Sequence, residues 1–236
     1  NVLVNWSWPN VITTRECYCC ATKTAKQTAN ADVIIRNGAG YDDWIKKLSD
    51  KKSISAARLM NVKDGQNEHL WYNPETMSRL ADELAKVFSS KMPSKKAEFK
   101  QNAAAYKKKV ARLNSELEKI KAERIEKPVA VSEPVFDYSL EKMGYKVANA
   151  HFAKAVEEES DPSYTDIKNL QNKIKRKEIA FFVYNVQSDG TTVKNIVNLC
   201  KKHDIPVVKV TETLPEGKNY FNWLQSEYRQ IAEIEK

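Results

Sequence analysis

The chain has 236 residues, 42% of them hydrophobic, and its 39 lysines and arginines against 31 acidic residues give a net charge of +8. This length allows one large domain or two modest lobes, and the apolar fraction excludes a chain that is disordered throughout. No apolar run reaches the ~18 residues of a transmembrane helix. Lysine clusters such as the one at 107–109 lack the interleaved aromatic residues of a nucleic-acid platform. We therefore interpret them as solvated faces that serve solubility or attraction to an anionic envelope.

The four cysteines are unevenly placed. Cys17, Cys19 and Cys20 lie close together, and Cys200 follows far away in a segment with helical periodicity. This spacing fits neither a disulfide framework nor a zinc motif of two CxxC pairs, and Cys200 is predicted to be a small buried hydrophobic residue. Neither a signal peptide nor a lipid-attachment cysteine opens the sequence, so for an exported protein we expect a mature or truncated form.

Strands and helices are predicted to alternate from residue 31 onward. Residues 33–35 form a β-branched run that ends at a glycine turn, and helical spacing follows at 44–48. Residues 53–73 are predicted to form a long irregular connection. Asn73 and Pro74 then provide an N-cap and a first-turn proline, which predict a helix whose apolar face extends to residue 88.

The strongest periodicity in the chain lies between residues 94 and 124. Seven apolar residues, spaced alternately four and three apart, form one stripe: Phe99, Ala103, Tyr106, Val110, Leu113, Leu117 and Ile120. The stripe predicts a single helix of about 46 Å. A coiled-coil dimer is one interpretation, but alanine and tyrosine at seam positions make a poor zipper. We prefer a rigid spine that joins two lobes.

Alternation of strands and helices resumes after this helix. Strands are predicted at 129–131, 179–184 and 207–210, and helices at 135–143, 191–203 and 220–234. This order is typical of parallel sheets covered by helices. The predicted fold class is therefore α/β: two α/β lobes with parallel sheets, joined by one long spine helix, with a metal cleft between the lobes. The expected boundaries are 1–92, 93–127 and 128–236.

Three potential metal ligands occur where ligands of open α/β sheets usually bind. His69 precedes a helix start, and Glu133 and Glu212 each follow a predicted strand. One neutral imidazole and two carboxylates balance a divalent charge and suit Zn²⁺, or Mn²⁺ if further oxygen ligands join. Each residue also has an ordinary structural interpretation. The histidine can cap a helix, Glu133 can interact with a helix dipole, and Glu212 can lie in a surface turn.

Several segments, in order along the chain, carry a family resemblance. They are ADVIIRNGAGYDDW (31–44), NEHLWYNP (67–74), SEPVFDY (132–138), FVYNVQSD (182–189) and VTETLP (210–215). From about residue 21 onward the chain resembles the zinc- or manganese-binding solute-binding proteins of bacterial metal ABC transporters, the adhesin-like metal-binding lipoprotein family. The resemblance implies two α/β lobes bridged by one long helix, and metal ligation by His69, Glu133 and Glu212.

The N-terminal segment departs from the family pattern. Family members have a first histidine ligand in a loop whose place is taken here by RECYCCAT (15–22), with Cys17 at the histidine's position. A cysteine thiolate is a competent zinc ligand, so Cys17 can complete the site; the alternative is a water molecule in that position. Trp71 and Tyr72 beside His69 can shield the ion or simply pack in the protein.

We expect an extracytoplasmic solute-binding protein that captures Zn²⁺, or alternatively Mn²⁺, and delivers it to a membrane ABC permease. It should be a monomer that binds no nucleic acid and is held at the membrane, if at all, by a lipid anchor outside this sequence. It is not expected to be an enzyme. One rival is a zinc-dependent hydrolase, although the dispersed histidines form no HExxH motif. The other is a surface adhesin or scaffold that associates through the long helix at Leu113 and Leu117.

Overall fold

The computed structural model describes residues 26, 28–48, 51–188 and 190–235. The chain divides into two compact units, the first ending at Glu68 and the second comprising His69–Lys236. The predicted domain boundaries at 92 and 128 stay a prediction. Among the described residues, no helix is both long and apolar enough to cross a bilayer.

The first unit contains a two-stranded parallel sheet, in which β1 (Ile34–Arg36) pairs with β2 (Ser53–Ser55). The turn after β1 is fixed by the carboxylate of Asp42, which accepts hydrogen bonds from the backbone N–H of Asn37 and of Gly38 at 2.6 and 2.9 Å. The prediction of an irregular segment at 53–73 is wrong at its start. There β2 is followed by α2 (Ala56–Met60), whose first turn is capped by Ser55. A strand of two serines around one isoleucine has too little apolar pattern to be recognised.

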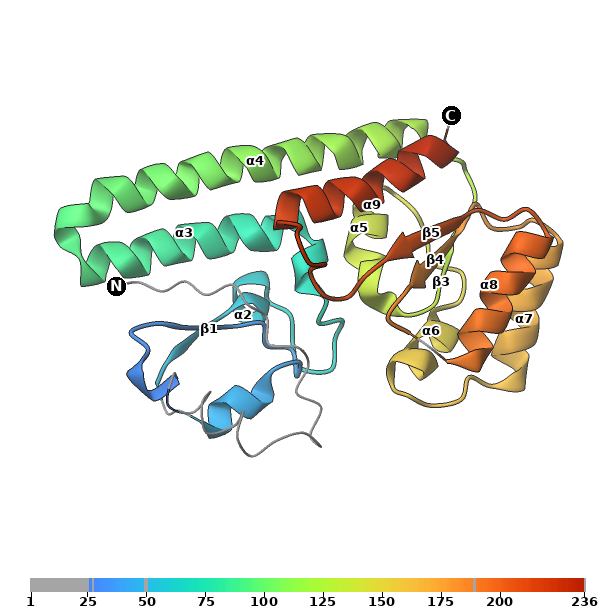
Figure 1. The fold of residues 1–236 in the computed structure, drawn as a ribbon, viewed down its shortest axis with the longest axis horizontal. Helices are drawn as coiled ribbons and strands as arrows, with labels where there is room; N and C mark the ends of the chain where they lie inside the picture. The colour runs from blue at the N-terminus through green and yellow to red at the C-terminus, as the bar shows by residue number, and fades with distance from the viewer. Residues whose placement is uncertain (1–25, 27, 49–50, 189, 236) are drawn as a thin grey trace. The chain divides into compact units, whose positions relative to one another are not determined.

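The second unit is built on a three-stranded parallel sheet with the order β3–β4–β5. Its strands are β3 (Ala130–Val131), β4 (Phe182–Asn185) and β5 (Val207–Val210). Phe182 is the partner of Ala130 on one side and of Val207 on the other. Helices α5 (Asp137–Lys142), α6 (Ala150–Glu157), α7 (Tyr164–Lys175) and α8 (Thr191–Lys202) lie around it (Figure 1).

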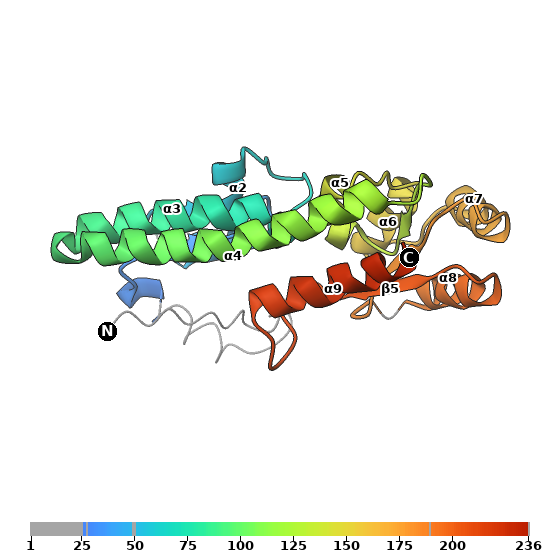
Figure 2. The ribbon, with the colours of Figure 1, turned by 90° about the horizontal axis from the view of Figure 1, so that it is seen from above.

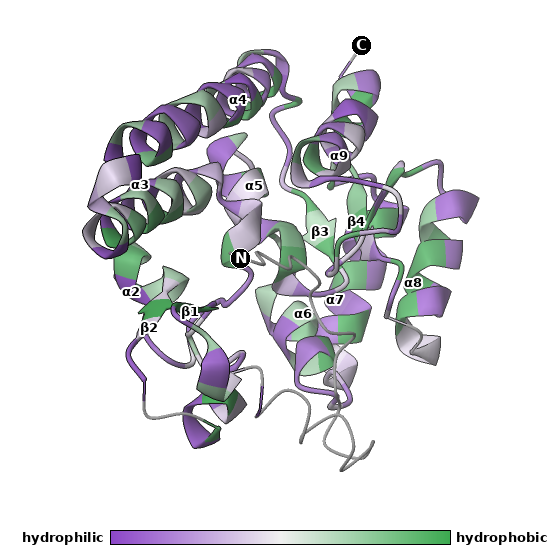
Figure 3. Ribbon diagram, turned by 60° about the vertical axis from the view of Figure 1, so that its left-hand side comes forward, coloured by the Kyte–Doolittle hydropathy of each residue, from purple (hydrophilic) through white to green (hydrophobic). Residues whose placement is uncertain are grey.

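The core of this sheet is apolar, as Figure 3 shows for β3 and β4, while α7 and α8 each carry hydrophobic and hydrophilic residues. Phe182 packs with Phe152, Leu170 and Ile196 from three helices. Cys200 belongs to the same cluster and is fully buried, and burial raises the pKa of its thiol to about 12. The prediction that Cys200 is a small buried residue is therefore confirmed.

Two long helices form an antiparallel hairpin (Figure 2). Helix α3 (Pro74–Lys91) begins as predicted, with the Asn73 side chain accepting from the N–H of Glu75. Helix α4 (Lys96–Glu123) is two residues shorter at its start than predicted and one shorter at its end. Helix α9 (Tyr220–Ile234) lies along α4. The α/β class with parallel sheets and one long helix is thus confirmed.

The apolar stripe of α4 is covered within the same chain. Val110, Leu113, Leu117 and Ile120 are buried, and α4 packs against α3, α5 and α9. Leu113 and Leu117 are each only 1% exposed. The stripe is therefore a core seam, and the surface on which the adhesin or scaffold alternative depends is not available.

One side chain takes the place of a neighbouring strand at the end of β3. The amide of Asn149 accepts from the N–H of Val131 at 3.0 Å and donates to its carbonyl at 2.8 Å. Because both backbone groups are buried, we expect Asn149→Ala to lower the free energy of unfolding by about 2–4 kcal/mol. Urea denaturation followed by circular dichroism measures this loss. A loss below about 0.5 kcal/mol for Asn149→Ala would contradict the interpretation.

Candidate metal site

His69 lies directly before a 3₁₀ turn, Leu70–Tyr72, that leads into α3. Only 3% of the residue is exposed, and burial lowers the pKa of the imidazole to about 4. The indole of Trp71 stands edge-on to the imidazole, with ring centroids 5.2 Å apart. Near neutral pH the imidazole is therefore uncharged, which is the form that binds a metal ion.

A carboxylate lies beside one nitrogen of this imidazole. Oε1 of Glu157, the last residue of α6, is 3.7 Å from Nδ1 of His69. A carboxylate on this side favours the tautomer with the proton on Nδ1, which leaves Nε2 for a ligand. Glu157, the first of three consecutive glutamates, is not among the predicted site residues.

One residue, Ser132, separates Glu133 from the end of β3, and the backbone of Glu133 is extended, with φ −148°. Asn185, the last residue of β4, donates from Nδ2 to Oε2 of Glu133 at 2.6 Å. The backbone N–H of Asn185 also donates to Oγ of Ser132, at 2.9 Å. These bonds fix the Glu133 carboxylate while using one of its two oxygens. Asn185 holds this carboxylate and is not among the predicted site residues, although its place at a strand end was a usable signal.

Glu212 lies in a half-buried bend that one residue, Thr211, separates from the end of β5. The next residue, Thr213, is tied to Gln187 by two hydrogen bonds: Gln187 Nε2 donates to Thr213 Oγ1 at 2.8 Å, and the Thr213 N–H donates to Gln187 Oε1 at 3.0 Å. Since β4 lies between β3 and β5, Glu133 and Glu212 follow the two strands that flank Asn185. Both carboxylates therefore occur at the carboxyl edge of one sheet, where open α/β sheets bind ligands.

The turn that carries His69 is hydrogen-bonded to both of these regions through Tyr72. The Tyr72 hydroxyl donates to the carbonyl of Thr211 at 2.6 Å, next to Glu212. The carbonyl of Tyr72 accepts from Oγ of Ser139, on the helix that follows Glu133, at 2.8 Å. Tyr72 is fully buried, against the rings of Phe136 and Trp223. Tyr72 thus belongs to the core of the second unit and links the three segments.

A buried carboxyl on α9 lies beneath this link. Oε1 of Glu227 accepts from the Tyr72 hydroxyl at 3.2 Å, the Thr211 N–H at 3.2 Å and the indole N–H of Trp223 at 2.8 Å. Glu227 is 4% exposed, and burial raises the pKa of its carboxyl to about 8. The uncharged acid is the favoured form near neutral pH, so Glu227 serves as a structural acceptor rather than as a charge in the site.

The structure places the three predicted donors as follows. His69, Glu133 and Glu212 belong to the same unit, on segments joined by the hydrogen bonds above. Within the described residues, however, their ligand atoms do not form a group in which all lie within 4.8 Å of one another. Cys17 lies outside the described residues. Coordination of one ion by these residues therefore stays a prediction.

Comparisons with known proteins agree with this architecture. The ZnuA family, described as "Zinc-uptake complex component A periplasmic", matches residues 17–234. A metal ABC transporter substrate-binding lipoprotein, ScbA of Streptococcus cristatus, is 27% identical over 238 residues, covering 88% of this chain and 74% of the relative. The manganese ABC transporter substrate-binding lipoprotein PsaA of Streptococcus mitis is 28% identical with the same coverage.

A solved structure shares the fold at lower identity. The periplasmic zinc-binding protein TroA of Treponema pallidum superposes with a TM-score of 0.69 at 16% identity, over 90% of this chain and 84% of its own. The family match confirms the predicted resemblance and the extracytoplasmic class, and it excludes the hydrolase alternative because the family consists of binding proteins. The chain belongs to the ZnuA family and is a metal-binding substrate-binding protein of an ABC transporter.

Proposed function

We propose that the protein binds one Zn²⁺ ion through His69, Glu133 and Glu212 and releases it to a membrane ABC permease, with Mn²⁺ as the second candidate. The observation that carries this proposal is the hydrogen-bonded convergence of their three segments through Tyr72. A neutral imidazole and two carboxylates offset the charge of a divalent ion without excess. Trp71, which is 4% exposed beside His69, keeps water from one side of the imidazole.

The identity of the metal depends on the fourth ligand. A thiolate from Cys17 would favour zinc, because sulfur ligands are soft, whereas a water molecule there would leave a set that also suits manganese. Among the relatives, PsaA carries manganese in its name and TroA carries zinc, and the family is described by zinc uptake.

Calorimetric titration at neutral pH tests the choice. We expect 1:1 binding, tighter for Zn²⁺ than for Mn²⁺, with Cys17→Ser reducing the preference for zinc. The change Cys200→Ser is the matched control, since Cys200 lies buried behind the sheet. Tighter binding of Mn²⁺ would overturn the order of metals. An unchanged preference in Cys17→Ser would assign the fourth position to water.

Asn185 should affect the affinity without touching the ion. Because its amide holds Oε2 of Glu133 at 2.6 Å, Asn185→Ala frees the carboxylate to rotate, and we expect the metal dissociation constant to rise about 10–100-fold. Competition with a fluorescent zinc chelator measures this change. Gln187→Ala, which releases the Glu212 loop from the turn after β4, should have an effect of the same sign. Wild-type affinity in Asn185→Ala would show that Glu133 is not a ligand.

A further inference from the structure

The positive charge of the chain is concentrated at one end of the helical hairpin. We define the hairpin tip as residues 82–112, which comprise the second half of α3, the connecting turn and the first half of α4. It contains nine lysines and arginines and three acidic residues, so 9 − 3 = +6 of the chain's net charge of +8 lies in this segment. Eight of the nine cationic side chains are exposed.

The three acidic residues of the tip are already paired with lysines. Asp82 pairs with Lys107 at 2.6 Å, Glu98 with Lys95 at 2.8 Å and Glu83 with Lys86 at 3.7 Å. The other six cations have no further acid in the segment to offset them: Lys91, Lys96, Lys100, Lys108, Lys109 and Arg112. The excess positive charge therefore lies in the turn and the first half of α4, where an anionic partner would meet it.

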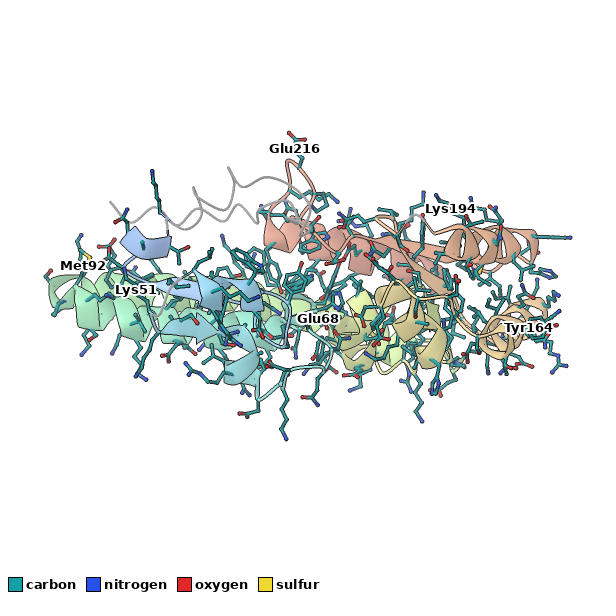
Figure 4. All side chains as sticks on the ribbon, turned by 90° about the horizontal axis from the view of Figure 1, so that it is seen from below. Lys51, Glu68, Met92, Tyr164, Lys194 and Glu216 are labelled. Atoms are coloured by element: carbon teal, nitrogen blue, oxygen red, sulfur yellow. The ribbon has the colours of Figure 1, made fainter. Side chains whose placement is uncertain are left out.

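The end of the tip is apolar. Met92, in the turn between the helices, is 44% exposed and lies at the far end of the hairpin in Figure 4. Pro93 beside it is exposed as well, and the rings of Phe88 and Phe99 stand 5.6 Å apart behind the turn. Lys91, Lys95 and Lys96 flank this apolar end. An apolar point ringed by long cationic side chains matches the boundary between lipid head groups and acyl chains.

We infer that the hairpin tip docks on the surface of an anionic phospholipid bilayer, with Met92 and Pro93 entering the head-group layer and the lysines on the phosphates. Charge complementarity supports a bilayer, because these cations lie on the exposed surface of α4 and at the turn before it, beside the apolar end of the tip. The exposed apolar end favours lipid over a soluble polyanion. Such docking goes beyond metal binding: it would hold a substrate-binding protein at the membrane that contains its permease.

Vesicle flotation at low and physiological salt tests the inference. We expect the protein to float with vesicles of phosphatidylcholine and phosphatidylglycerol, but not with phosphatidylcholine alone, and binding to fall as salt rises. Changing Lys91, Lys96, Lys100 and Lys108 to Gln should lower the partition coefficient at least about tenfold. The matched control changes four exposed lysines outside the tip, Lys175, Lys194, Lys201 and Lys202, to Gln and should retain binding.

A second variant separates lipid from other anions. Met92→Ser, which removes the apolar side chain without adding a charge, should weaken binding to the anionic vesicles while leaving binding to soluble polyphosphate unchanged. Failure to float with anionic vesicles, or an equal loss in the control quartet, would overturn the inference. So would full vesicle binding by Met92→Ser, which would instead indicate a soluble polyanion or an acidic protein. All variants should bind zinc like the wild type, so the outcome is independent of the proposed metal site.

Discussion

Replacing His69 by alanine is expected to weaken zinc binding at least about a hundredfold. The imidazole is the only nitrogen donor of the proposed set, and a structural zinc site gains roughly 10–16 kcal/mol from about four ligands, or about 3 kcal/mol for each. Because burial keeps the pKa of His69 at about 4, the ring is neutral near pH 7 and no proton has to leave before the metal binds.

Competition with a chelator of known affinity, at pH 7 and again at lower pH, measures this effect. His151→Ala is the matched control, because His151 is an exposed histidine on α6 of the same unit. The wild type should lose affinity as the pH falls, since protons compete for the imidazole and the carboxylates. Equal zinc affinity in His69→Ala and His151→Ala would remove His69 from the site.

The second large effect concerns Glu227, whose exchange for glutamine should make the protein more stable at high pH. Burial raises the pKa of the folded carboxyl from 4.5 to about 8, so between these values the native state holds a proton that the unfolded chain has lost. The free energy of unfolding therefore falls as the pH rises through this window, by up to about 1.4 kcal/mol per pH unit. Glutamine carries no such proton and keeps an oxygen to accept from Tyr72, Thr211 and Trp223.

Urea denaturation between pH 5 and pH 8 tests this expectation. The free energies of unfolding of the two proteins should differ least at pH 5. With each step upward in pH, Glu227→Gln should become more stable relative to the wild type. Glu233→Gln, an exposed position on the same helix, should follow the wild-type curve. Parallel curves for Glu227→Gln and the wild type would show that Glu227 is charged in the folded protein.

Local sequence patterns predicted several helices and strands correctly. The strand Val207–Val210 and the helix Tyr220–Ile234 occur with the predicted bounds, and α3 begins at its predicted cap. The strand predicted at 179–184 instead spans Phe182–Asn185. Residues 179–181 are buried without belonging to it, because an apolar run reports burial and not which residues pair.

For the site, the sequence supplies candidate ligands only. His69, Glu133 and Glu212 are predicted because metal-binding side chains at helix starts and strand ends have a recognisable place in α/β proteins. The neighbours of these residues were not predictable, because Asn185, Gln187 and Glu157 contact segments that are distant in the sequence. Glu227 had a usable signal: it lies on the apolar face of α9, four residues after Trp223 and next to Tyr228. A glutamate there must be hydrogen-bonded or protonated.

Anomalous diffraction from crystals of the protein, collected at the zinc and manganese absorption edges, tests the central claim most directly. We predict a single peak at the zinc edge, about 2.0–2.2 Å from a nitrogen of His69 and from carboxylate oxygens of Glu133 and Glu212. A fully occupied metal peak that contacts none of these three residues would contradict the account.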